Sequence, residues 1–387
     1  MGSGRRCRRF AIVAVVAMVL SGCVRGDLEF LASDATGGRD NDTPGSVLAQ
    51  EYLLAYLEAW TEGPSHTGTG VDAYKQQFTL GTNLIGVMPG TDLADEYVLV
   101  GAHYDHVAAC ADKRAGDDIC NGATDNAAGV VAALAVARAI HFSAEPPRRS
   151  IIFAFWDREE DGLLGARHYV QNPLIPLADT VAYVNLDIQG SNLRPSLRNV
   201  SFAVGAETGG ARLRQLVDEA VAPSSLDTRQ LSVVFGQGRS DHVPFIGAGV
   251  PSVFLTDATG PCYHTDSDDL AVVDFDKLTQ QIRILHRLTR SLSSTDALPT
   301  FTGNTPLATY DDAVVLLGAV ELLLADLATF TTEQATQLVE SHAELQTMVD
   351  AGPAAFDGTD ITRVLTMAAM AVTAFTTGPC DGFLAAP

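Results

Sequence analysis

The chain has 387 residues, of which 47% are hydrophobic and 19% are charged, so it can bury a sizeable core. Its 25 basic and 47 acidic residues give a formal net charge of −22. Such a surface repels nucleic acid, and we expect no nucleic-acid partner. We interpret the acidity as a solvated surface, because no acidic run is long enough to form an acidic tail.

Residues 1–22 are predicted to be a signal peptide. Four arginines precede the apolar stretch Phe10–Leu20, which is too short to span a membrane comfortably. The following Leu-Ser-Gly-Cys sequence at residues 20–23 resembles the lipobox of bacterial lipoproteins. We therefore expect Cys23 to carry a lipid, and the protein to be exported and held at a bacterial membrane by that lipid alone, on the periplasmic or cell-surface side. The alternative is an ordinary cleaved signal with an incidental cysteine.

Helix and strand patterns alternate over most of residues 27–295, which predicts a three-layer α/β/α domain with a mixed, mostly parallel central sheet, here bounded as residues 23–295. In chain order we expect helices at 27–32 and 46–60, strands at 74–78, 83–88 and 97–102, a helix at 126–142, a strand at 151–156, a helix at 163–170, strands at 181–186 and 201–204, a helix at 211–221, a strand at 252–255 and a helix at 275–292.

The composition changes after this domain. Residues 296–308 are rich in Ser, Thr, Pro and Gly and are predicted to be a linker, and residues 309–387 a helical C-terminal extension. Its three expected helices span 310–327, 332–349 and 359–375. Because this part contains no clustered histidines or carboxylates, we interpret it as a cap or packing subdomain.

Four cysteines follow the leader, an even number in a chain expected to be exported: Cys110, Cys120, Cys262 and Cys380. Disulfides are therefore favoured over zinc thiolates. Cys110 and Cys120 flank a charged loop and could close it locally, which would leave Cys262 to Cys380, one of three arrangements.

Possible metal ligands follow the apolar runs. His103 follows the run at 97–102, the Glu159-Glu160 pair the run at 151–156 and Asp187 the run at 181–186, while Asp125 and His264 lie in loops. The carboxyl ends of parallel strands form one rim of a sheet, so these residues should meet there.

Imidazole nitrogens and carboxylate oxygens suit zinc, and a carboxylate can bridge two ions. Asp125 is suited to bridge the two ions because its neighbours in the sequence are small. The sequence alone does not show which of the other ligands bind the same ion. Adjacent glutamates on an extended chain point to opposite sides, so Glu159 and Glu160 cannot easily bind the same ion and should have different roles. Asp105, two residues from His103, can accept its imidazole N–H.

The order of these motifs resembles the M28 family of zinc aminopeptidases over roughly residues 27–295. The motifs are Gly-Ala-His-Tyr-Asp at 101–105, Gly-Ala-Thr-Asp-Asn-Ala-Ala-Gly at 122–129, Phe-Trp-Asp-Arg-Glu-Glu-Asp-Gly-Leu-Leu-Gly at 155–165, Asn-Leu-Asp at 185–187, Ser-Asp-His-Val-Pro-Phe at 240–245 and Tyr-His-Thr at 263–265.

This resemblance implies two zinc ions per chain, one completed by His103 and Asp187 and the other by Glu160 and His264. It further implies that Glu159 is the general base and that Asp105 orients His103, with Asn126 as a second supporting residue. A cis peptide bond is implied after Asp125. The resemblance also implies that Tyr263 hydrogen-bonds the developing oxyanion and that Arg239 neighbours the substrate. His106 is expected to line the pocket, and His242 to serve packing or hydrogen bonding around the site.

The predicted function is a dizinc aminopeptidase that removes the N-terminal residue of peptides with a glutamate base. Alternatives are a carboxypeptidase or a glutaminyl cyclase on the same fold, or a non-catalytic surface lipoprotein that binds zinc or peptides. The presence of Glu159 favours an enzyme over a non-catalytic zinc-binding protein, because a protein that only binds metal does not need a base that is not a ligand.

Overall fold

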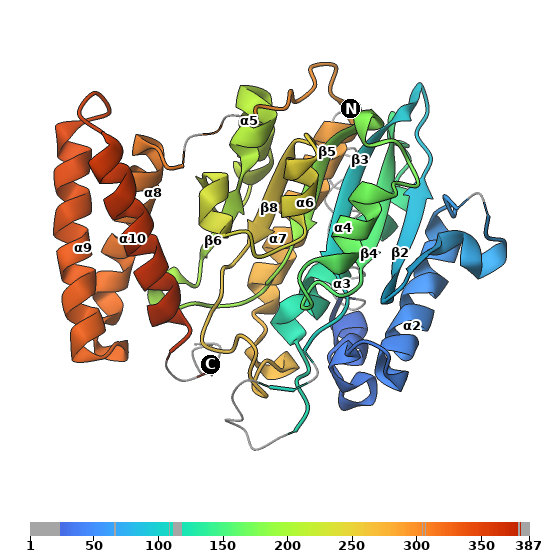
Figure 1. The fold of residues 1–387 in the computed structure, drawn as a ribbon, viewed down its shortest axis with the longest axis horizontal. Helices are drawn as coiled ribbons and strands as arrows, with labels where there is room; N and C mark the ends of the chain where they lie inside the picture. The colour runs from blue at the N-terminus through green and yellow to red at the C-terminus, as the bar shows by residue number, and fades with distance from the viewer. Residues whose placement is uncertain are drawn as a thin grey trace, which may run out of the picture.

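A computed structural model describes residues 24–65, 67–107, 109–110, 118–303, 305, 307–377 and 380. The predicted signal peptide and Cys23 lie outside these residues. The chain folds into a central sheet with helices on both faces and a layer of three further helices at one end, which confirms the predicted fold class (Figure 1).

The sheet has eight strands. Their spatial order is β1 (Lys75–Phe78), β2 (Gly81–Met88), β4 (Arg149–Trp156), β3 (Leu93–His103), β5 (Thr180–Leu186), β8 (Ser252–Thr256), β6 (Val200–Val204) and β7 (Asp227–Leu231). β3 runs parallel to β4 and β5, β8 is parallel to β5, and β7 is parallel to β6. The β1–β2, β2–β4 and β6–β8 pairs are antiparallel, so the sheet is mixed.

Helices cover both faces of the sheet. Residues 24–31, α2 (Pro44–Trp60), α3 (Ala128–His141), α5 (Gly210–Val221) and α7 (Phe275–Ser294) share the larger hydrophobic core, whereas α4 (Leu164–Gln171) and α6 (His242–Gly247) cover the other face. Ala123–His141 is apolar and long enough to cross a membrane, but 89% of that stretch is buried, as expected for a core helix.

Short helical segments connect these elements. They are η1 (Asp34–Arg39), η2 (Gly70–Tyr74), η3 (Ala123–Ala127), η4 (Leu177–Asp179), η5 (Pro195–Leu197), η6 (Ala206–Gly209), η7 (Val233–Gly236), η8 (Leu270–Val272) and η9 (Leu324–Thr329). Among the strands and α-helices, two were absent from the sequence prediction. β7 is polar in sequence because it is an edge strand, and α6 spans less than two helical turns.

The C-terminal helices are α8 (Tyr310–Leu323), α9 (Thr332–Ala351) and α10 (Gly358–Phe375), close to the predicted ranges. Each begins with a capping box, in which the side chains of the N-cap and N3 residues satisfy backbone N–H groups. α8 packs on β7, so the bundle covers the edge of the sheet at which β6 and β7 lie (Figure 1).

Candidate metal centre

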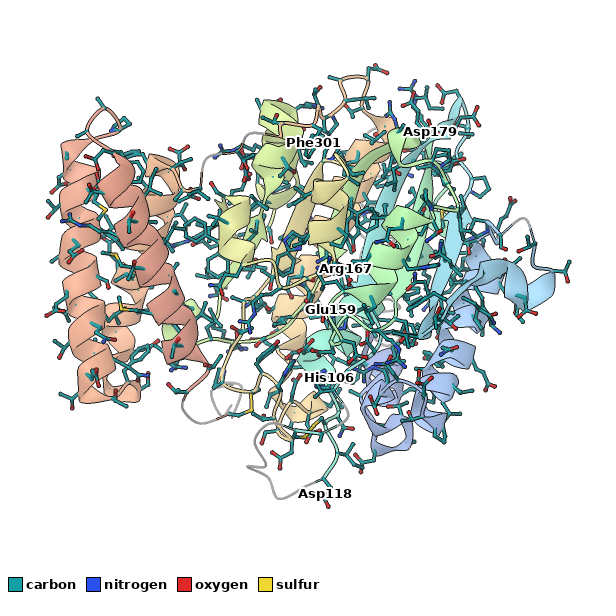
Figure 2. All side chains as sticks on the ribbon, in the orientation of Figure 1. His106, Asp118, Glu159, Arg167, Asp179 and Phe301 are labelled. Atoms are coloured by element: carbon teal, nitrogen blue, oxygen red, sulfur yellow. A yellow bond between two sulfur atoms is a disulfide. The ribbon has the colours of Figure 1, made fainter. Side chains whose placement is uncertain are left out.

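The predicted ligands meet at the carboxyl edge of the parallel strands. His103 ends β3 and pairs in register with Trp156, the last residue of β4, from which the chain continues to Glu159 and Glu160. Asp187 directly follows β5. In Figure 2, Glu159 and His106 lie toward this edge, whereas Asp179, just before β5, lies at the opposite one. The topology therefore delivers residues distant in sequence to one rim.

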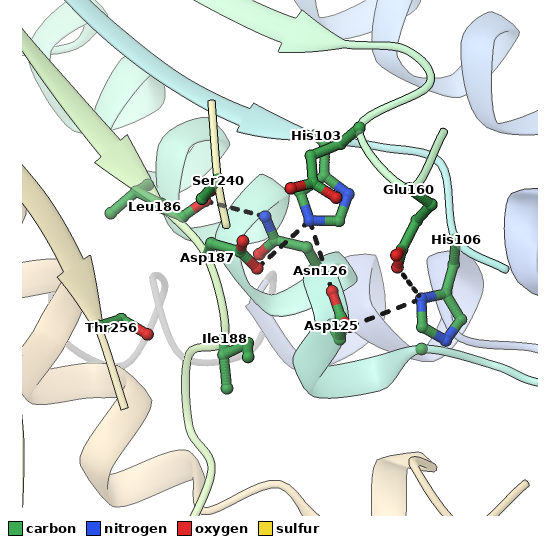
Figure 3. A network of polar contacts seen from close by, with 12 residues as sticks. His103, His106, Asp125, Asn126, Glu160, Leu186, Asp187, Ile188, Ser240 and Thr256 are labelled. Carbon is green, nitrogen blue, oxygen red and sulfur yellow. Dashed lines mark hydrogen bonds and ion pairs between the residues drawn. The ribbon is translucent and has the colours of Figure 1, made fainter. Parts of the chain in front are cut away.

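The side chains form two adjoining clusters, each with ligand atoms within 4.8 Å of one another. One contains His103, Glu159 and Asp187, and the other contains His106, Asp125, Glu160 and His264. Figure 3 shows His103 meeting Asp125 and Asp187, and His106 meeting Glu160. All five predicted ligands are thus brought together, in the two pairs that the resemblance implies.

Asp125 lies between the clusters. Its Oδ1 is 3.4 Å from Nε2 of His103, and its Oδ2 is 3.2 Å from Nε2 of His264. The expected cis peptide bond joins Asp125 to Asn126. One carboxylate therefore points an oxygen at an imidazole of each cluster, which is the placement that a bridging ligand needs.

The electrostatics of the site favour bound cations. Burial raises the pKa of Asp187 and, more strongly, that of Glu159. Burial alone would lower the pKa of His264, but the carboxylates of Asp125 and Glu160 raise it to about 10. A buried site with this excess of carboxylates attracts positive charge, and its imidazole and carboxylate donors are those that zinc takes in catalytic sites. The residues present therefore fit zinc.

Asp105 contacts both His103 and the two adjacent glutamates. The atom closest to Nδ1 of His103 is the backbone carbonyl oxygen of Asp105, at 3.0 Å, whereas its carboxylate oxygen is 3.7 Å away. The carboxylate instead accepts the backbone N–H groups of Glu159 and Glu160, at 3.1 and 3.3 Å. Asp105 thus orients His103 through its main chain and both glutamates through its side chain. Asn126 donates to the carbonyl of Leu186 at 2.8 Å, which ties the start of α3 to the end of β5.

Three residues have roles at the site that the sequence did not predict. His106, expected in the pocket wall, is fully buried, and its Nδ1 lies 3.0 Å from Oε1 of Glu160, so it belongs to the second cluster. Asp268 accepts from the backbone N–H of Asp125 at 3.0 Å and also binds Thr124. Arg39, 1% exposed, donates to four backbone carbonyls, among them those of residues 104 and 122, at 2.6 to 3.0 Å. Only His106, one residue past a motif, carried a signal in the sequence.

A pocket opens beside the clusters and has about 540 Å³ of unfilled space, part of it open to solvent. Asp125, Glu159 and Asp187 line it, whereas Glu160 does not. Two predicted substrate-site residues also line it. The Tyr263 ring stacks on His264 at 3.8 Å, and the Arg239 guanidinium lies 5.8 Å from the centre of the Tyr263 ring.

Both disulfides join the cysteines in the arrangement considered from sequence, Cys110 with Cys120 and Cys262 with Cys380. The first closes the loop that follows β3, and the second lies directly before Tyr263 and His264. Each therefore restrains a segment that borders the metal centre.

An α/β domain with clustered imidazoles and carboxylates at the carboxyl edge of its sheet defines the class of metal-dependent hydrolases. Residues 83–289, more than half of the chain, match the sequence model of peptidase family M28, and the chain belongs to this family. By family it is a zinc metallopeptidase.

Curated relatives are distant. Leupeptin-inactivating enzyme 1 of Streptomyces exfoliatus is 28% identical over 58% of this chain, which spans 45% of that protein. Leucine aminopeptidase 1 of Trichophyton rubrum is 25% identical over 71% of this chain and 74% of the relative. The LapA aminopeptidase of Legionella pneumophila shares the fold, with a TM-score of 0.58 and 21% identity over 73% of this chain and 74% of that chain.

Proposed function

We propose that the protein is a dizinc aminopeptidase that hydrolyses the bond after the N-terminal residue of a peptide. The observation that carries the proposal is the pair of adjoining clusters linked by Asp125, whose two carboxylate oxygens face His103 and His264, with Glu159 lining the adjacent pocket. One ion would be held by His103, Asp125 and Asp187, and the other by Asp125, Glu160 and His264. When bound, two such ions polarise a carbonyl and make water acidic enough to attack at neutral pH.

Glu159 is the residue placed to move the proton. Its carboxylate lines the pocket, whereas the Glu160 side chain meets His106 and His264, at 3.0 and 3.1 Å. The Asp105 carboxylate accepts hydrogen bonds from the backbone N–H groups of Glu159 and Glu160, which fixes the main chain from which both glutamate side chains extend. Glu159 takes a proton from the attacking water and returns it to the leaving amine, while Glu160 serves as a ligand.

Two further groups would orient the substrate. The Tyr263 hydroxyl, in the pocket wall beside His264, donates a hydrogen bond to the oxygen of the scissile carbonyl as negative charge develops there. The carboxylates of the cluster attract the protonated α-amine of a free N-terminus, which an N-blocked peptide lacks. This charge preference supports an aminopeptidase over a carboxypeptidase.

The test is a substrate panel, assayed with and without a chelator. Aminoacyl-anilides with a free amine should be hydrolysed, their N-acetylated counterparts should be at least about 100-fold slower, and the chelator should abolish turnover. Cleavage only from the C-terminus would show a carboxypeptidase, and cyclisation of N-terminal glutamine would show a glutaminyl cyclase. Metal binding without any turnover would leave only a zinc or peptide binder.

We also propose that the protein is exported and attached to a bacterial membrane through Cys23. The lipobox-like sequence at residues 20–23 supports this proposal, as do the two disulfides, which form and persist in oxidising compartments. Its substrates would then be peptides outside the cytoplasm.

A further inference from the structure

We infer that the C-terminal helices complete the substrate pocket, and that Val372 of α10 helps to select an aliphatic N-terminal side chain. This inference rests on the proposed aminopeptidase function. Val372 lines the pocket beside the metal clusters, together with Ile188, Phe235 and Phe254. The other lining residues belong to the peptidase domain, so one wall comes from a part of the chain that the family match does not include.

The end of α10 is fixed against the peptidase domain. Arg194, 1% exposed, donates to the backbone carbonyls of Ala374 and Thr377 at 2.8 and 2.9 Å, and its guanidinium lies 4.6 Å from the centre of the Phe330 ring. These carbonyls lie within five residues of Val372, in the last turn of α10 and just beyond it. The Cys262–Cys380 disulfide adds a covalent connection to the segment before Tyr263. Val372 is therefore held in place rather than on a free helix.

A second attachment supports another part of the wall. Asp312 of α8, 2% exposed, accepts from the backbone N–H of Ser232 at 2.8 Å and from its hydroxyl at 2.7 Å. η7 begins at the next residue and carries Phe235, which packs against two hydrophobic clusters that both include residues of α8. The bundle thus contributes Val372 directly and positions Phe235.

The chemistry of this wall identifies the side chain that it would accept. Ile188, Phe235, Phe254 and Val372 give this wall apolar surface, whereas Gln237, Arg239, Thr256 and Thr259 line other parts of the pocket. An apolar group that packs against the first four side chains gains from being removed from water. The pocket adjoins Glu159 and Asp187, so the group that fills it would belong to the residue whose carbonyl is attacked. We therefore expect N-terminal leucine, isoleucine, valine or methionine.

The experiment compares the full-length zinc-loaded protein with Val372→Phe, Val372→Ala and, as a control of equal bulk, Thr373→Phe on the exposed side of the same helix. Val372→Phe should lower kcat/KM for the leucine anilide at least about 10-fold, with a smaller loss for the alanine anilide, because the added ring fills the pocket. Val372→Ala should shift the preference from leucine toward phenylalanine. Thr373→Phe should leave the kcat/KM ratios of leucine to alanine anilide and of leucine to phenylalanine anilide at their wild-type values. Zinc content should be the same in all four proteins.

Unchanged substrate ratios in both Val372 variants would overturn the inference, as would an equal shift in Thr373→Phe. If Val372→Phe fails to fold, Val372→Ala decides alone, because it only removes two methyl groups. If the wild-type protein hydrolyses no substrate with a free N-terminus, the proposed function fails. If it does so while the Val372 ratios stay constant, only the role of the bundle is refuted.

Discussion

Replacing Glu159 by glutamine tests the division of labour between the two adjacent glutamates. The side chain is 8% exposed and lines the pocket, and glutamine keeps its shape but cannot accept the proton. Loss of a positioned base costs about 10² to 10⁴ in rate. At about 1.36 kcal/mol per factor of ten, this is a rise of about 3 to 5 kcal/mol in the barrier, chiefly in kcat.

The fold should tolerate this change. Burial raises the pKa of Glu159 well above its usual range, which means that its charged form is unfavourable where it lies. A neutral amide removes that buried charge, so the thermal midpoint of metal-free Glu159→Gln should equal or exceed that of the wild type. Zinc content should also be retained, because His103, Asp125 and Asp187 remain. Low activity could then not be attributed to misfolding.

The assay measures kcat, zinc per chain and thermal midpoint for Glu159→Gln and Glu160→Gln side by side. Glu160→Gln should lose zinc, since its carboxylate is 3.0 Å from His106 and 3.1 Å from His264. If Glu159→Gln loses zinc while Glu160→Gln retains it, the two roles are reversed. If neither variant changes turnover, the site is not catalytic.

Three further variants test other parts of the account. Asp125→Ala should not retain two zinc ions per chain, because no remaining carboxylate separates the two cations, and metal analysis that finds two would refute the bridge. Burial lowers the pKa of His242 to about 3, so below pH 6.5 the unfolded chain binds a proton that the folded chain does not, and stability falls as pH falls. Between pH 6.5 and 5 the wild type should lose about 1.6 kcal/mol more than His242→Phe in denaturant titrations, and equal losses would contradict this. Cys23→Ser should leave the membrane fraction or remain an uncleaved precursor, and normal fractionation and processing would refute the lipid anchor.

Four of the five candidate ligands could be found from sequence because they follow an apolar run or open a helix, and the topology of a parallel sheet converts that position into proximity. His264 lies in a turn and was recognised only through its Tyr-His-Thr motif. His106 was harder to assign, because its distance from His103 does not show that its ring turns toward Glu160. Arg39 and Val372 gave no local signal. Each reaches the site from a distant segment, and their contacts depend on how helices pack rather than on a motif.

The central claim is that two zinc ions and a free N-terminus are both required for turnover. The most direct measurement is titration of zinc into the metal-free protein, with bound metal followed by calorimetry and leucine-anilide hydrolysis followed in parallel. We predict that binding saturates at two ions per chain, that activity reaches its plateau there, and that the N-acetylated anilide stays uncleaved throughout. Full activity without added metal, or equal hydrolysis of the acetylated substrate, would contradict the account.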